Sequence, residues 1–194
     1  MPEAAAIAAV HENFRFLVLE VKNQILATQE ILRDDAQSLV SKLFARDDYI
    51  DNLKSVIENK CYRLLGSEKI EKKKVDRLRG VLVATANLER IADFAVNIVG
   101  QLQYLEDRDV LERFGPDPFI EAVVQSLDIV EAAVLEVDMQ MALQLCRSEV
   151  DIDELYAKVF RSIMDELRAG QGPEDLVTSV FVYRYFERMG DSLL

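Results

Sequence analysis

Two pairs of carboxylates repeat along this chain at a spacing that could bind cations. Glu89 and Asp93 stand four residues apart, and Glu187 and Asp191 repeat the pair 98 residues later. Like charges at this helical spacing cost about 0.2–0.5 kcal/mol, so a pair that occurs twice favours a function. Such oxygens bind hard or borderline cations, or present charge to a partner. The alternative is an ordinary salt-bridged helix face, for which the nearby cations are Arg90, Arg184 and Arg188.

Two further acid pairs accompany the first two. Asp47 and Asp51, and later Glu149 and Asp153, share the acid-x-x-x-acid spacing and recur at an offset of 102 residues. Asp47 and Glu149 stand near expected helix starts, where acids cap free N–H groups, so capping alone explains these two equally well. As ligands, the four pairs would give each half of the chain enough oxygens for a polynuclear metal site.

Composition limits the metals and the functions. The 194 residues carry a net charge of −12 and show no basic stripe, which excludes nucleic-acid binding of the usual kind. Because His11 is the only histidine, a metal site would consist mainly of oxygen ligands, which favours magnesium, calcium, manganese or iron. Cys61 and Cys146 lack C-x-x-C spacing, so we expect core thiols in a reducing compartment rather than a disulfide.

The sequence predicts a cytoplasmic protein without direct membrane insertion. No apolar run approaches the roughly 20 residues that cross a bilayer. The N-terminus also lacks the basic start of a signal peptide.

Helices must position the acids, because the chain is rich in helix formers and has only 7 Gly and 4 Pro. Apolar spacing predicts an all-α fold of six helices, over about 14–45, 47–66, 73–105, 118–146, 149–168 and 173 to the end. The acid blocks repeat in the same order, which indicates two tandem antiparallel three-helix bundles. The expected division is a frayed N-terminus at 1–12, bundles at 13–107 and 118–194, and a linker at 108–117.

The expected third helix places its acids on an outer face. Val81, Leu88 and Ile91 belong to a continuous apolar stripe, and Glu89 and Asp93 lie on the opposite side. Apolar residues also flank the acids, so this helix is expected to pack on more than one side. Repulsion in such a groove is relieved by a cation, by protonation, or by an Arg or Lys.

These motifs resemble a known family. The segments 88–98 and 184–191 are similar to the two signature segments of the PhoU family of phosphate-uptake regulators. The segments 50–53, 152–155 and 76–79 resemble its other repeated elements, so the resemblance runs from about Phe14 to the end.

The resemblance implies a non-enzymatic regulator of phosphate uptake and phosphate-starvation signalling, here expected to be a homodimer. The implied partners are the phosphate transporter ATPase and a sensor histidine kinase. Some family members carry multinuclear iron or zinc clusters on the outer surface, and magnesium or manganese also suits these oxygens. The implied metal ligands are Asp47, Asp51, Glu89, Asp93, Glu149, Asp153, Glu187 and Asp191.

The chain departs from the family pattern in three ways. Ala92 replaces the usual Gly of the first motif, whereas Gly190 keeps it in the second. Phe94 and Ser192 stand where a His is common. The last helix stops three residues after Asp191, so we expect a truncated helix and a fragment of a longer protein.

Two other functions are weighed against this one. A helical regulatory module fused to a missing C-terminal domain would fit a truncated last helix. A carboxylate-bridged di-metal bundle enzyme would need inward-facing Glu-x-x-His motifs, which a chain with one histidine does not supply.

Overall fold

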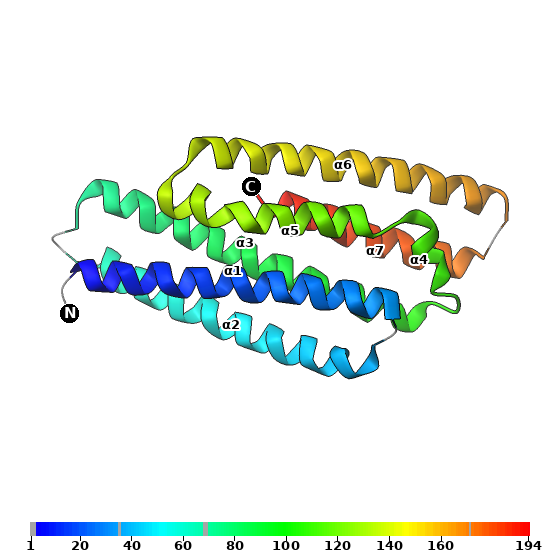
Figure 1. The fold of residues 1–194 in the computed structure, drawn as a ribbon, viewed down its shortest axis with the longest axis horizontal. Coiled ribbons are helices and arrows are strands. Elements are labelled where there is room, and N and C mark those ends of the chain that lie inside the picture. Colours follow the sequence, from blue (N-terminus) through cyan, green and yellow to red (C-terminus); the bar gives the residue numbers. More distant parts are fainter. Residues whose placement is uncertain (1–2, 35, 68–69, 171) are drawn as a thin grey trace.

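The computed structural model describes residues 3–34, 36–67, 70–170 and 172–194, and this part of the chain is all-helical, as predicted (Figure 1). A 3-10 turn at Leu102–Tyr104 follows α3, and a π turn at Ala132–Glu136 follows α5. The α-helices are α1 Glu3–Asp34, α2 Gln37–Leu65, α3 Lys72–Gln101, α4 Asp109–Phe114, α5 Asp117–Glu131, α6 Met139–Arg168 and α7 Pro173–Asp191.

The helices form two three-helix sets that share one core. Helices α1, α2 and α3 pack on one another, and α6 packs on α5 and α7. The two sets meet where α3 packs on α7 and α1 packs on α5, and the buried apolar residues form a continuous cluster through both. Figure 1 shows α2 and α6 as the outermost helices, one on each side of this shared core.

The first helix is displaced from its expected position. It begins at Glu3 rather than after a frayed segment 1–12, because its Ala-rich start favours a helix and Val10 is fully buried. It ends at Asp34 rather than near residue 45. The 4–3 apolar spacing continues from Leu32 in α1 through Leu39 to Leu43 in α2, and all three pack in or against the core, so periodicity did not reveal the break.

The chain also reverses once inside the expected helix 118–146. Helix α5 ends at Glu131, and Val137 adopts φ 59°, a left-handed conformation that stops a helix. Asp138 then caps α6 by accepting hydrogen bonds from the backbone N–H groups of Gln140 (2.8 Å) and Met141 (3.2 Å). Helix α6 therefore begins at Met139, ten residues before the expected start at 149.

The expected linker 108–117 contains the short helix α4. Val110 and Leu111 of α4 are buried, and the Tyr183 hydroxyl donates a 2.7 Å hydrogen bond to the Leu111 carbonyl. Gly115 ends the helix with φ 69°. This segment therefore packs on α7 instead of running free.

Aromatic rings join α5 to α7 in the core. Phe119 lies with its ring centroid 5.4 Å from Tyr183 and 5.5 Å from Phe186, and all three side chains are buried. Offset and tilted ring pairs of this kind add to the stabilisation from buried area.

No helix in the described ranges is both long enough and apolar enough to cross a membrane. The two cysteines are free. Cys61 is buried, as predicted, and burial raises the pKa of its thiol to about 11. The expectation of a core thiol was wrong for Cys146, which is exposed on α6.

Candidate functional site

Three carboxylates of the second bundle converge at the surface between α6 and α7. Glu149 and Asp153 lie one turn apart on α6, and Asp191 ends α7. Each offers one oxygen, and these three oxygens lie within 4.8 Å of one another. Glu149 is half-buried and the two aspartates are exposed, so the cluster is open to solvent. An all-oxygen ligand set of this kind suits hard divalent cations.

Glu187 lies one turn before Asp191 and is coupled to this triad. Its carboxylate forms an ion pair with Arg184, and its Oε2 atom has no hydrogen-bond partner within the described ranges. Burial raises the pKa of Glu187, the charges of Asp191 and Asp153 raise it further, and Arg184 opposes the shift. Glu187 is buried, with 12% of its side chain exposed.

The first bundle brings the equivalent acids together between α2 and α3. Burial raises the pKa of Asp47 to about 6, and the charges of Asp93 and Asp51 are the next largest causes. Burial also raises the pKa of Asp93, followed by the charges of Glu89 and Asp51. These four acids therefore repel one another within a partly buried cluster.

The glutamate of each motif is neutralised, whereas the other acids are not. Lys54 of α2 pairs with Glu89 at 2.6 Å, as Arg184 pairs with Glu187. Glu187 therefore follows the salt-bridge alternative with Arg184, whereas the partner of Glu89 is Lys54 of the neighbouring helix rather than Arg90. Within the described ranges, none of the remaining acids has a basic group within 4 Å. We call the corresponding acids of the two bundles the first triad, which is Asp47, Asp51 and Asp93, and the second triad, which is Glu149, Asp153 and Asp191. Among the described residues, only the second triad brings three carboxylate oxygens within 4.8 Å of one another.

The capping explanation was wrong for Asp47 and Glu149. Asp47 lies in the interior of α2, which begins at Gln37, and Glu149 lies in the interior of α6. The error arose because both helices begin about ten residues earlier than the apolar spacing indicated. Both carboxylates are therefore available to a ligand.

Sequence reasoning missed the buried residue that supports the first triad. Gln24 of α1 is fully buried, and its Nε2 atom donates a 3.1 Å hydrogen bond to Asp47 Oδ1. Its signal was a polar side chain inside the apolar stripe that contains Val21 and Ile25. This hydrogen bond orients Asp47 in the way that outer-shell partners orient metal-binding carboxylates.

Close packing holds α7 against α6 at the second triad. A Cβ atom on Gly190 would lie 3.0 Å from Ile152 Cγ2, so glycine allows this approach. The equivalent Ala92 of the first motif is fully buried. Phe94, one of the two residues at positions where a His is common in the family, stacks on Tyr185 with ring centroids 6.0 Å apart. Ser192, the other, donates a 3.1 Å hydrogen bond to the Arg188 carbonyl.

The single histidine does not join either triad. His11 lies on α1 in a hollow lined also by Lys74 and Arg77, and burial followed by the charges of Arg15 and Arg77 lowers its pKa. The triads lie between neighbouring helices at the surface rather than in the bundle core. The described residues therefore do not form the inward Glu-x-x-His arrangement of a di-metal bundle enzyme.

Replacing Asp47 with asparagine is expected to stabilise the chelator-treated protein at pH 7 by about 1 kcal/mol, after allowing for solvent screening. A raised pKa means that the folded state keeps a proton which the unfolded carboxyl loses above its ordinary value near 3.8. Stability should therefore fall as pH rises from about 4 to 6, and the variant should lose this dependence. Urea unfolding across that range measures it.

The exposed neighbour Asp48 provides the control, because Asp48→Asn removes the same charge from the adjacent position. This variant should leave the pH dependence in place. Equal stability of the Asp47 variant and the parent at pH 7 would contradict the repulsion described here.

Comparison with known proteins gives one family. The family described as "PhoU domain" matches residues 17–102 and 119–193. A phosphate-specific transport system accessory protein PhoU homolog of Clostridium acetobutylicum is 25% identical over 177 residues, covering 88% of this chain and 79% of that protein. PhoU homolog 1 of Thermotoga maritima is 27% identical over 180 residues, covering 91% of this chain and 76% of that protein.

Solved structures share the fold. PhoU from Pseudomonas aeruginosa superposes with a TM-score of 0.85 at 18% identity, covering 98% of this chain and 92% of that one. The phosphate transport system regulatory protein PhoU from Streptococcus pneumoniae gives 0.84 at 16% identity, covering 98% and 91%. At these identities the likeness shows the fold, which agrees with the predicted architecture.

Proposed function

This chain belongs to the PhoU family, and from that premise we propose that it is a non-enzymatic accessory regulator of phosphate transport. The observation that carries the proposal is the double match of the family domain to both halves of the chain. The relatives named above are accessory proteins of a phosphate-specific transport system, which supports the same role here.

The proposed mode of action is protein–protein contact in the cytoplasm. The partners proposed are the ATPase of the phosphate transporter and a sensor histidine kinase, through which the protein would repress phosphate-starvation signalling. The domain boundaries 13–107 and 118–194 remain part of this proposal, with each bundle as one repeat.

We further propose that each triad binds divalent metal, with iron, zinc, magnesium or manganese as candidates. The donors fit, because three carboxylate oxygens converge at the second triad and no basic group pairs with them in the described ranges. The raised pKa of Asp47 and Asp93 supports the same assignment for the first triad, since a cation would relieve that repulsion. A bound cation would supply charge neutralisation that joins α2 to α3 and α6 to α7, with Glu89 and Glu187 as neighbouring oxygens.

Deleting the gene from its host is expected to raise expression of a phosphate-starvation reporter in phosphate-rich medium. The parent gene should restore repression, because the protein is proposed to act on the transporter or its sensor. In parallel, the purified chain should retain the transporter ATPase or the sensor kinase in a pull-down.

A second complementation separates regulation from metal binding. A gene carrying both Asp93→Ala and Asp191→Ala tests the triads, and Asp151→Ala, an exposed acid on α6 outside them, is the matched control. Unchanged reporter expression in the deletion strain, with neither partner retained, would contradict the regulator role.

A further inference from the structure

One face of α6 carries apolar side chains that no described helix covers. The apolar residues on this face are spaced alternately by four and three positions, and Asp153 is the one polar residue in the series. Such spacing is typical of a coiled-coil seam. Exposed fractions reach 68% at Met139, 53% at Leu143, 52% at Val150 and 38% at Phe160. We call this face the outer stripe; its members are Met139, Leu143, Cys146, Val150, Ala157, Phe160 and Met164.

The outer stripe is distinct from the face that α6 uses inside its own bundle. Leu145, Ile152, Val159 and Ile163 are buried, and α6 packs on α5 and α7. At about 100° per residue, the stripe lies roughly 120–150° away from that buried face. Figure 1 shows α6 running along the outside of the molecule. Single exposed apolar residues are ordinary, whereas a stripe of about 37 Å with one polar interruption marks an interaction surface.

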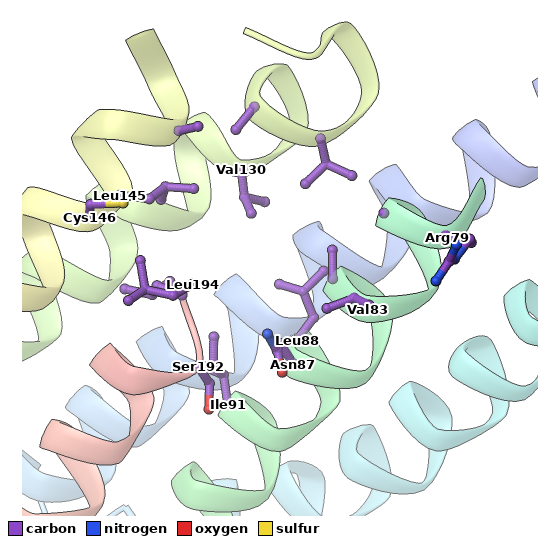
Figure 2. Close-up of a pocket in the computed structure, with 16 residues that line it drawn as sticks. Arg79, Val83, Asn87, Leu88, Ile91, Val130, Leu145, Cys146, Ser192 and Leu194 are labelled. Atoms are coloured by element: carbon purple, nitrogen blue, oxygen red, sulfur yellow. The ribbon is translucent and has the colours of Figure 1, made fainter. Parts of the chain in front are cut away.

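A hollow of about 520 Å³ extends the apolar surface on one side of the stripe. Figure 2 shows Leu145 and Cys146 of α6 on one wall of this hollow and Val83 of α3 on the other, with Leu194 between them. Val83 and Leu194 are themselves exposed. On the other side the stripe is bordered by charged residues, which are Arg147, Glu154 and Arg161.

We propose that the outer stripe packs antiparallel against the outer stripe of a second copy of this chain. The charges that border the stripe alternate in sign, and this alternation favours a second copy as the partner. In an antiparallel pair related by a two-fold axis, the charged border of one copy faces the same border of the other. With Cys146 level with Ala157 of the second copy, Arg147 faces Glu154 of that copy. The two-fold axis produces this ion pair twice. The same register sets Leu143 beside Phe160 and Met139 beside Met164 of the second copy.

Other alignments place like charges together. A shift of the antiparallel register by seven residues in one direction brings Arg147 against Arg147 of the second copy. A shift by seven residues in the other direction brings Arg147 against Arg161 of the second copy, and Glu154 against its own counterpart. A parallel pair would bring Glu149 against Glu154 and Asp153 against its own copy. Flanking charges of this kind select orientation and register. The charges beside the stripe therefore complement those of a second copy in the antiparallel register that places Cys146 level with Ala157.

Asp153 does not block this arrangement. It occupies one position within the stripe, and its carboxylate approaches those of Glu149 and Asp191 within 4.8 Å. The carboxylate is therefore directed toward the second triad rather than toward the second copy.

Sedimentation equilibrium of the purified chain tests the association. The parent is expected to be a dimer at micromolar concentration, and the double variant Leu143→Glu, Val150→Glu is expected to weaken the dimer at least 100-fold while circular dichroism stays helical. Val177→Glu is the control, because Val177 is equally exposed but lies on α7. A monomeric parent at 100 µM, or a dimer that the double variant leaves intact, would overturn the proposal.

Cross-linking tests the register independently of that double variant. In Ala157→Cys, oxidation by copper phenanthroline should join Cys146 to the introduced thiol of the second copy, each disulfide releasing two protons and passing two electrons to copper. The parent should not cross-link, because its two Cys146 thiols would lie about 16 Å apart along the axis. Lys158→Cys, one residue further round the helix, should stay uncross-linked. Cross-linking of the parent but not of Ala157→Cys would refute this register.

Discussion

Replacing Phe186 with alanine is expected to lower the free energy of unfolding by about 3–5 kcal/mol. Only 1% of this side chain is exposed, and its ring stacks on Phe119 at 5.5 Å and lies 6.3 Å from Tyr183. Removing the ring loses transfer free energy and leaves a cavity where α5 meets α7, because close-packed neighbours relax only partly. A loss of this size is about a fifth or more of the stability of a typical domain.

Urea unfolding followed by circular dichroism measures the effect of Phe186→Ala. The melting temperature should fall by roughly 10 °C for a chain of this length. Phe181→Ala is the control, since Phe181 lies on the same helix but is exposed, and its loss should stay within about 0.5 kcal/mol. A loss below 1 kcal/mol at Phe186 would mean that the aromatic cluster is not the principal contact between α5 and α7.

Asp191→Ala is expected to weaken divalent-cation binding at the second triad by at least about 100-fold. The change removes one of three converging oxygens and one of three negative charges, and loss of a supporting outer-shell group alone typically costs 10–100-fold. Asp93→Ala should act in the same way on the first triad, and the double variant should bind neither cation. Manganese titration by calorimetry and metal analysis of the purified protein measure both losses.

Stability provides a second readout of the same sites. A cation at 100 times its dissociation constant stabilises the folded state by about 2.7 kcal/mol per site, and this increment should vanish site by site in the two variants. Asp151→Ala, which removes an exposed charge of α6 outside the triad, should keep full cation binding. Full metal content in Asp93→Ala would rule out the first triad as a metal site.

The side of α3 on which Asp93 lies could be predicted from the sequence because it depends on a single helix. In α3 the stripe containing Val81, Leu88 and Ile91 is buried as expected, and the helix packs on α1, α2 and α7, so the direction of Asp93 followed from periodicity. The buried face of a helix is marked by apolar residues at 3.6-residue spacing, and this spacing is visible in the amino-acid sequence.

The helix ends could not be predicted in the same way. Apolar spacing runs through the reversals after Asp34 and after Glu131, where a left-handed Val137 gives no sequence signal of the kind that glycine gives. Those missed reversals made Asp47 and Glu149 look like helix caps. The pairing of Lys54 with Glu89 depends on how α2 rotates against α3, which no pattern within one helix reveals.

The two neutralising ion pairs differ in what they connect. Lys54 reaches from α2 to Glu89 on α3, whereas Arg184 and Glu187 lie on the same helix, with Arg184 also 5.8 Å from the Tyr156 ring of α6. In the first bundle an interhelical ion pair therefore holds α2 against α3 whether or not a cation is bound. In the second bundle, the described residues form no ion pair between α6 and α7. Loss of a bound cation would then affect the two bundles unequally. The contact between α6 and α7 would weaken more than the contact between α2 and α3, so the second bundle would become the more flexible of the two.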